Sequence, residues 1–352
     1  MIKCTLLNLA VSISWLISSS VVAQAPQQPP TAANPINRAI EQNEPVQEMR
    51  NLVRDISKYA RRFNPNFGII TEGGLDILEK EDPVDPTQSS PARTYMKSFD
   101  GINILGLNFH PPIKGKDKII TDKKTKKKLL RLANLGKQRG LKIFVTDFAA
   151  NLKTAQESYN LNLAKGYIPF TAKSVGADYI FNNISDILSR PINENPRNIN
   201  GLKNVQNYLY LTDSSSFDRQ QDFVIGVSNT NYDLIIVDVF HKGRTPYSKA
   251  AVQGMKFKKL GARRLVFAYM NIGAAENYRY YWRDNWREGE PSFISESIPA
   301  NPDKHYVEYW QAGWRRIITG NTNSYIYGII KQGFDGVILG GLDSFMFFES
   351  GG

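Results

Sequence analysis

Eight short runs of apolar, β-forming residues alternate with helical stretches along this chain, and this alternation limits the fold more than any other feature. Several runs are apolar on both faces: residues 234–237 read Leu-Ile-Ile-Val and residues 265–268 read Leu-Val-Phe-Ala. Such runs are typical of parallel strands that helices cover on both sides. The eight runs occupy residues 67–71, 101–109, 141–148, 167–171, 208–212, 234–240, 264–272 and 334–339.

Eight parallel strands with intervening helices predict an α/β fold that forms a single (β/α)8 TIM barrel. An open, doubly wound sheet is the alternative. Apolar residues at helical spacing predict one amphipathic helix between Met49 and Phe63, which Asn64-Pro65 ends. Residues 273–332 are too many for an ordinary loop, so we expect a long excursion with a helix near residues 309–318.

The N-terminus has the layout of a secretory signal peptide. Lys3 is followed by an apolar run over residues 6–17 and then by small residues that end in Val21-Val22-Ala23. We therefore expect a signal peptide at 1–23, a disordered linker rich in Pro, Gln and Ala at 24–45, and the barrel at 46–352. The alternative is an uncleaved anchor, but Asn8, Ser12 and Ser14 interrupt the run.

The expected location is secreted or periplasmic, with no membrane span in the mature chain. Cys4, the only cysteine, leaves with the signal peptide, which excludes disulfides and thiol chemistry afterwards. His110, His241 and His305 have no metal-ligand spacing, and the chain lacks a P-loop, a G-x-G-x-x-G and a G-x-S-x-G motif. We expect neither a metal nor a cofactor.

The formal charge of +11 is concentrated in one segment. From Lys114 to Lys142 there are 12 Lys and Arg residues and two Asp residues, a net +10. One interpretation is a solvated helix face. The other is contact with an anionic envelope polymer. We do not expect nucleic acid as a partner, because exported proteins seldom meet it.

Polar residues follow several of the predicted strands. In a barrel the active site lies at the C-terminal ends of the strands, so these residues are the candidates. Sugar hydrolysis would need two carboxyl groups that flank one bond, whereas a strand-end Asp can equally cap the next helix. Asp335 precedes its strand and is expected to be structural. The candidates are Glu72, Asp147, Asp213, Asp238, Asn271, Glu276 and Asp343.

The densest aromatic cluster is Tyr278-Arg279-Tyr280-Tyr281-Trp282, followed by Trp286. Aromatic rings suit the apolar C–H faces of sugars, and Arg279 could add hydrogen bonds. Packing beneath a long loop is the competing interpretation.

Residues 231–238 and 264–282 resemble glycoside hydrolase family 114, the endo-alpha-1,4-polygalactosaminidase-like barrels. Residues 307–310 (Val-Glu-Tyr-Trp) and 333–339 (Gly-Phe-Asp-Gly-Val-Ile-Leu) extend this resemblance. It implies a TIM barrel that acts on galactosamine-containing polysaccharide.

The resemblance also implies a circular permutation. The family's Gly-Phe-Asp-Gly-Val strand is its fourth and four strands follow it, whereas this sequence reaches that strand just before Gly352. The runs at 67–70, 99–102, 142–148 and 166–170 resemble the family's fifth to eighth strands. Barrel termini lie close together, so such a permutation is physically acceptable.

Two catalytic positions of the family carry no carboxylate in this chain. The family's fourth-strand Asp corresponds to Gly340, and its sixth-strand Glu corresponds to Leu105. The resemblance therefore implies a barrel that binds polysaccharide without hydrolysing it. The expected ligand-binding residues are Asp238, Asn271, Glu276, Tyr278, Arg279, Tyr281, Trp282 and Asp343.

Two alternatives remain open. One is an active hydrolase with a different pair, Asp238 with Asp147 or Asp343. The other is a structural envelope protein that binds anionic polymer through the basic segment. Lys114, Lys116 and Lys118 follow a predicted strand, so we expect them near the barrel mouth, where they would favour a neutral or acidic glycan.

Overall fold

The computed structural model describes residues 44–82, 84–85, 87–113, 116–172 and 190–351. The signal peptide and almost all of the linker lie outside these residues, so both stay predictions. Eight parallel strands form one sheet, which confirms the predicted α/β barrel. They are β1 (Gly68–Glu72), β4 (Gly101–Leu105), β7 (Lys142–Phe148), β8 (Ile168–Ala172), β9 (Tyr208–Leu211), β10 (Leu234–Val237), β13 (Leu265–Asn271) and β17 (Gly336–Gly340).

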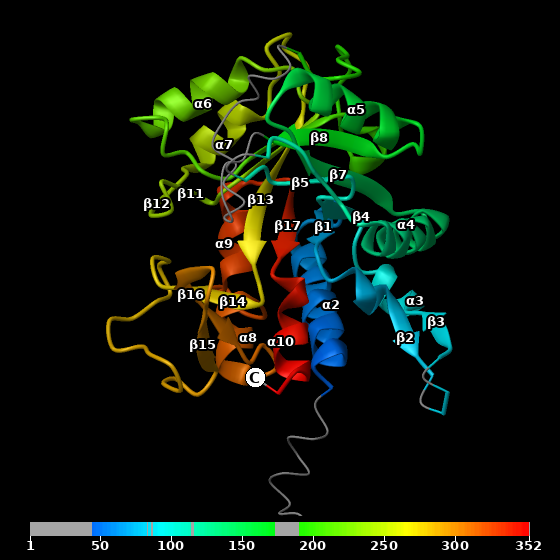
Figure 1. The fold of residues 1–352 in the computed structure, drawn as a ribbon. Coiled ribbons are helices and arrows are strands. Elements are labelled where there is room, and N and C mark those ends of the chain that lie inside the picture. Colours follow the sequence, from blue (N-terminus) through cyan, green and yellow to red (C-terminus); the bar gives the residue numbers. More distant parts are fainter. Residues whose placement is uncertain (1–43, 83, 86, 114–115, 173–189, 352) are drawn as a thin grey trace, which may run out of the picture. The chain divides into compact units, whose positions relative to one another are not determined.

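The sheet closes on itself through its first and last strands. Its order is β8-β7-β4-β1-β17-β13-β10-β9, so each strand neighbours the ones before and after it in the chain. The ladder between β1 and β17 runs from Gly68 opposite Gly336 to Thr71 opposite Leu339, and Figure 1 shows the blue and red strands side by side. Strands β8 and β9, at the two ends of this order, also lie in contact. The open, doubly wound alternative is therefore wrong.

Helices surround this barrel. The predicted helix after the linker is α2 (Pro45–Phe63), which begins with a proline in its first turn and buries Met49, Leu52, Val53 and Ile56. Figure 1 shows it beside α10 (Phe345–Glu349), so helices from both ends of the described chain pack together. Between them in the chain, and before the excursion after β13, come α3 (Arg93–Met96), α4 (Lys123–Gln138), α5 (Leu152–Leu163), α6 (Gln220–Ser228) and α7 (Lys249–Met255).

The excursion after β13 contains more structure than the sequence indicated. Its predicted helix is α8 (Ala312–Ile318), and a second helix, α9 (Tyr325–Gln332), follows. Between β13 and α8 an antiparallel sheet forms from β14 (Ala274–Glu276), β16 (Asn301–Val307) and β15 (Ile294–Ile298).

Elsewhere, short hairpins and 3₁₀ turns join the main elements. The hairpins are β2 (Glu79–Glu81) with β3 (Ser89–Pro91), β5 (Phe109–His110) with β6 (Ile119–Ile120), and β11 (Phe240–His241) with β12 (Thr245–Pro246). The 3₁₀ turns are η1 (Leu75–Leu78), η2 (Leu202–Asn204) and η3 (Leu342–Ser344).

An aromatic residue followed by aspartate precedes three of the barrel strands, and the three aspartates have the same role. Asp100, before β4, accepts a hydrogen bond from the backbone N–H of Ile69 on β1 and pairs with Arg61. Asp335, before β17, likewise accepts one from Val266 N–H on β13 and pairs with Lys256 and Arg263. Each carboxylate thus joins the N-terminal end of its strand to the neighbouring strand, which is the structural role expected for Asp335.

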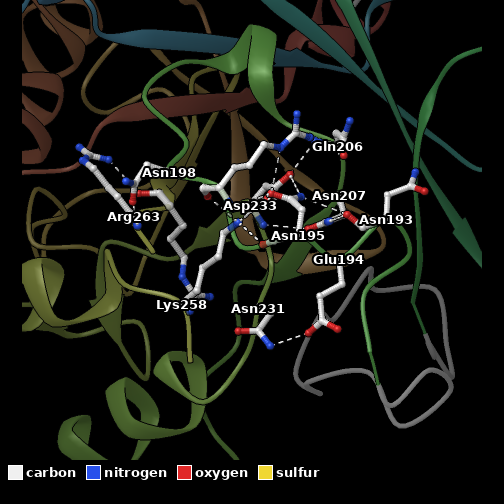
Figure 2. Close-up of polar contacts among 12 residues, drawn as sticks. Asn193, Glu194, Asn195, Asn198, Gln206, Asn207, Asn231, Asp233, Lys258 and Arg263 are labelled. Atoms are coloured by element: carbon white, nitrogen blue, oxygen red, sulfur yellow. Dashed lines mark hydrogen bonds and ion pairs between the residues drawn. The ribbon is translucent and has the colours of Figure 1, made fainter. Parts of the chain in front are cut away.

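The third aspartate, Asp233, lies at the centre of a buried cluster before β10 (Figure 2). Its carboxylate pairs with Lys258 Nζ at 2.6 Å, and both side chains are fully buried. It also accepts hydrogen bonds from the side chain of Asn195 and the backbone N–H of Gln206. The cluster therefore fixes residues before β9 to the beginning of β10.

Asp233→Ala should lower the free energy of unfolding by about 3–5 kcal/mol, because it leaves the Lys258 ammonium buried without its counter-charge. Urea unfolding followed by circular dichroism measures the change. Asp55→Ala removes an exposed carboxylate whose partner, Arg315, keeps its second ion pair with Glu48, so this variant serves as the control, with little expected effect. Equal stability of the two variants would contradict the assigned role.

Candidate functional site

A cleft of about 1060 Å³ opens at the C-terminal ends of the barrel strands. Its walls come from strand ends and from the antiparallel sheet of β14, β15 and β16, and they include Glu72, Tyr210, Tyr269, Lys304 and Asp343. A cavity of about 1240 Å³ opens at the opposite, N-terminal ends. Barrel enzymes place their chemistry at the C-terminal ends, so the smaller cleft is the candidate active or binding site.

Glu72, the last residue of β1, is the most perturbed acid in this cleft. Its side chain is buried, and burial raises its pKa to about 7, with the nearby charge of Asp343 acting in the same direction. Its Oε2 atom accepts hydrogen bonds from Asn103 Nδ2 at 2.7 Å and from the Tyr210 hydroxyl at 2.8 Å. Near neutral pH this carboxyl group is therefore protonated in about half of the molecules.

A chain of buried polar groups fixes Glu72 from inside the barrel. Asn103 on β4 accepts hydrogen bonds from the Tyr208 hydroxyl on β9 and from the Thr146 hydroxyl on β7. The Tyr208 and Thr146 hydroxyl oxygens also lie 2.7 Å apart, and because each hydroxyl has one hydrogen, the one that donates to the other does not donate to Asn103 at the same time. Three strands, β4, β7 and β9, thus support one carboxyl group on β1, and this hydrogen-bond network defines its position.

Asp343 lies beside Glu72, although it comes from the other end of the described chain. It belongs to the turn η3 after β17, and its carboxylate is 3.6 Å from the position that a Cβ atom on Gly73 would occupy. Its side chain remains exposed, and the surrounding cleft walls raise its pKa. The structure therefore brings one buried and one exposed carboxyl group to the same wall.

Arg279 holds the second group of acids. Its guanidinium binds both oxygens of Asp238, at 2.9 and 3.0 Å, and also bonds Glu276 Oε2. Glu276 is buried, but Arg279 and Lys304 outweigh this burial and hold its pKa below the usual range. Asp238 also accepts the backbone N–H of Val239. Both carboxylates are thus engaged in ion pairs within the cleft wall.

Gly340 and Leu105, where the sequence resemblance predicts the family's catalytic positions, differ in their surroundings. A Cβ atom on Gly340 would lie 2.5 Å from the Tyr269 hydroxyl oxygen, so a carboxylate there would require the Tyr269 ring to move. Leu105 lines the cleft with a half-buried aliphatic side chain. Neither position can donate or accept a proton through its side chain.

Asp147 lies outside the cleft lining. It is fully buried and accepts hydrogen bonds from Asn108 N–H, Asn108 Nδ2, Ser158 Oγ and Asn162 Nδ2. These contacts connect the loop after β4 to α5. Asp147 and Asp238 therefore do not meet, and each has a structural set of partners.

The predicted ligand-binding residues divide into two groups. Tyr281 and Trp282 lie outside the cleft lining: Tyr281 accepts the backbone N–H of Glu276 and packs on Trp314, while Trp282 packs on Trp286 and His305. Within the lining, Asn271 caps the turn at Gly273 and Ala274, and the Tyr278 hydroxyl donates to Glu276. The cleft brings together Asp238, Asn271, Glu276, Tyr278, Arg279 and Asp343.

Sequence reasoning missed an aromatic platform on the cleft wall. Tyr306 on β16 stacks on Phe347 of α10, with ring centroids 4.0 Å apart and an interplanar angle of 6°. Both rings line the cleft and are half-buried. The pairing of these two rings joins residues 41 positions apart, and β16 itself was not predicted, so no local pattern could have indicated the platform.

The charge of the cleft differs from the sequence expectation. Among the residues that the structure describes, its lining includes six acidic residues and four basic ones. Lys116 and Lys118, expected at the mouth, are absent from the lining, and Lys118 pairs with Glu157 on α5; Lys114 lies outside the described residues. The acidic excess removes the repulsion that would have opposed a cationic glycan.

In the described residues no group of three His, Cys, Asp or Glu side chains could hold a metal ion. Over the same part of the chain, no helix has the length and apolar character that crossing a membrane requires.

The fold is a (β/α)8 barrel with a cleft at the C-terminal ends of its strands. Residues 207–351 match the model of Glycoside-hydrolase family GH114, which confirms the resemblance over this part of the chain, from β9 to α10. The strands β1, β4, β7 and β8 lie outside the matched residues.

Curated relatives match a similar share of the chain. Uncharacterized protein MJ1477 of Methanocaldococcus jannaschii is 30% identical over 162 residues, which are 44% of each chain. An uncharacterized protein of Thermotoga maritima is 32% identical over 130 residues, 36% of this chain and 38% of the relative. The matches thus span less than half the length of these relatives.

Replacing Glu72 should change how stability depends on pH. Because its pKa rises from 4.5 to about 7 on folding, its protonated form stabilises the fold fully below pH 4.5, and this contribution disappears as pH rises through 7. Relative to the native protein, Glu72→Gln should therefore gain about 3 kcal/mol between pH 4.5 and pH 8. Urea unfolding of both proteins across this range measures the difference. A pH-independent difference would show that Glu72 titrates normally.

Proposed function

We propose that the cleft binds a polysaccharide that contains amino sugars. The acidic excess of the lining carries this proposal, because protonated amino groups would be attracted to it. The stacked rings of Tyr306 and Phe347 supply an apolar face for a sugar ring, and the Tyr278 hydroxyl and the Arg279 pair supply polar contacts. The match to Glycoside-hydrolase family GH114 supports a saccharide as the ligand class.

We further propose that the cleft binds its polysaccharide without hydrolysing it, because the family's catalytic positions carry no carboxyl group in this chain. Retaining enzymes use one carboxyl group as nucleophile and one as proton donor, whereas Gly340 and Leu105 provide neither. The Tyr269 ring occupies the space next to Gly340, which supports a site that has been rebuilt for binding. A circular permutation remains part of this proposal: the matched residues contain the last four barrel strands and β17 closes onto β1.

Tyr306→Ala should weaken binding of partly de-N-acetylated galactosamine oligosaccharides about tenfold, since it removes an aromatic surface worth about 1 kcal/mol or more. Isothermal titration calorimetry measures this loss. Tyr280→Ala is the matched control, because Tyr280 is exposed and lies outside the cleft lining. Loss of affinity in the control alone would place the ligand elsewhere.

A second candidate function is hydrolysis by a new pair, Glu72 and Asp343. The raised pKa of Glu72 favours it, because a carboxyl group that keeps its proton near pH 7 can act as a general acid. Asp343, exposed at the same wall, would act as nucleophile or base. The earlier pairs are less suitable, since Asp147 is outside the cleft and Asp238 is bound to Arg279.

Release of reducing ends from galactosamine polymers distinguishes the two functions. If the barrel only binds, the native protein and the variants Glu72→Gln and Asp343→Asn should show the same background rate. Turnover that both variants abolish, and that falls above pH 7 as Glu72 loses its proton, would establish the second function instead. Asp147→Asn is the control outside the cleft. Its rate is compared only after circular dichroism has shown that the variant is folded.

A further inference from the structure

The cavity at the N-terminal ends of the barrel strands forms a strongly basic basin, which we define by its lining. It lies before β1, β4, β7, β9 and β13, at the end of the barrel opposite the cleft. Seven Lys and Arg residues line it, against two acids, Asp100 and Asp335. The functions proposed for the cleft do not use this end of the molecule.

The two acids of the basin are already neutralised. Asp100 pairs with Arg61, and Asp335 pairs with Lys256 and Arg263. The other five cations have no ion pair with any residue that the structure describes. These five are Arg93, Lys97, Arg139, Lys142 and Lys203.

Lys142 shows most directly that positive charge in the basin lacks nearby negative charge. It is the first residue of β7, its side chain is half-buried, and burial lowers its pKa with no carboxylate to oppose the effect. Concave walls with one sign of charge concentrate the electrostatic potential and raise the local concentration of counter-ions. The basin therefore attracts anions more strongly than the same charges would on a flat surface.

The basic helix α4 offers a weaker case, although most of the formal charge lies in its part of the sequence. Lys128 pairs with Asp76 and Arg131 pairs with Glu79, so part of the helix charge is compensated. Lys118, before the helix, pairs with Glu157. The basin, in contrast, gathers its unpaired cations around one cavity. The basic segment contributes only its last two cations, Arg139 and Lys142, to this lining.

We propose that the basin binds a segment of anionic polysaccharide, as a second site independent of the cleft. Its volume of about 1240 Å³ exceeds the roughly 300–1,000 Å³ of common small-molecule sites, so it can hold several linked units. The aromatic residues of its lining, Phe67, Phe99 and Phe267, are buried. Single-stranded nucleic acid would need exposed rings on which bases stack, so the lining favours acidic sugars.

A fluorescent oligogalacturonate, whose sugars carry carboxylates, tests the site on the full-length protein by anisotropy titration. The triple variant Arg139→Gln, Lys142→Gln and Lys203→Gln should bind at least about tenfold more weakly. The slope of log affinity against log salt should also decrease by about two, because fewer counter-ions are released. The matched control, Lys123→Gln, Lys124→Gln and Lys127→Gln on α4, removes the same charge and should retain native affinity.

Equal losses in the two triple variants would overturn the proposal, since binding would then depend on net charge alone. Equally tight binding of a single-stranded oligonucleotide of the same charge would also overturn it, as would no binding of the oligogalacturonate. The Tyr306→Ala variant should bind the oligogalacturonate normally. This variant separates the two sites, because oligogalacturonate binding in the basin does not depend on whether the cleft binds amino sugars.

Discussion

The ladder between β1 and β17 is the contact on which the site depends. It joins the first and last strands of the barrel and sets Gly68 opposite Gly336. This pairing brings Glu72, at the end of β1, to the same wall as Asp343, just after β17. Without it the sheet would stay open, and the two carboxyl groups would belong to distant edges.

The aspartates before β4, β10 and β17 support this closure from the other end. Each accepts a backbone N–H from a neighbouring strand or its approach, and each pairs with a cation. The buried ion pair with Lys258 holds the Asp233 carboxylate where it accepts the backbone N–H of Gln206 (Figure 2). These three structural aspartates therefore lie at the N-terminal ends of strands, whereas Glu72, whose pKa is raised, lies at a C-terminal end, where barrel architecture places active sites.

The two ends of the barrel also differ in charge. The cleft has an acidic excess, and its Asp238 and Glu276 are held by Arg279. The opposite basin has a basic excess, and its acids are paired. Such a separation would suit the two proposed ligands, amino sugars at one end and acidic sugars at the other, because each field would attract its own ligand and repel the other.

The sequence by itself determined the eight strands and the helix α2, because apolar periodicity is a local property that burial requires of any covered strand or amphipathic helix. It also identified Glu72, Asp238 and Asp343 as strand-end groups, and a family resemblance at residues 231–238, 264–282, 307–310 and 333–339 that lies within the matched residues 207–351. It could not distinguish Asp147, whose five hydrogen-bond donors come from the loop after β4 and from α5, from a free carboxylate. Only the tertiary structure decided the raised pKa of Glu72, the Tyr306–Phe347 platform and the charge of the two cavities. The reason is physical: burial, hydrogen bonding and electrostatic potential depend on which distant residues meet, and a linear pattern does not contain those distances.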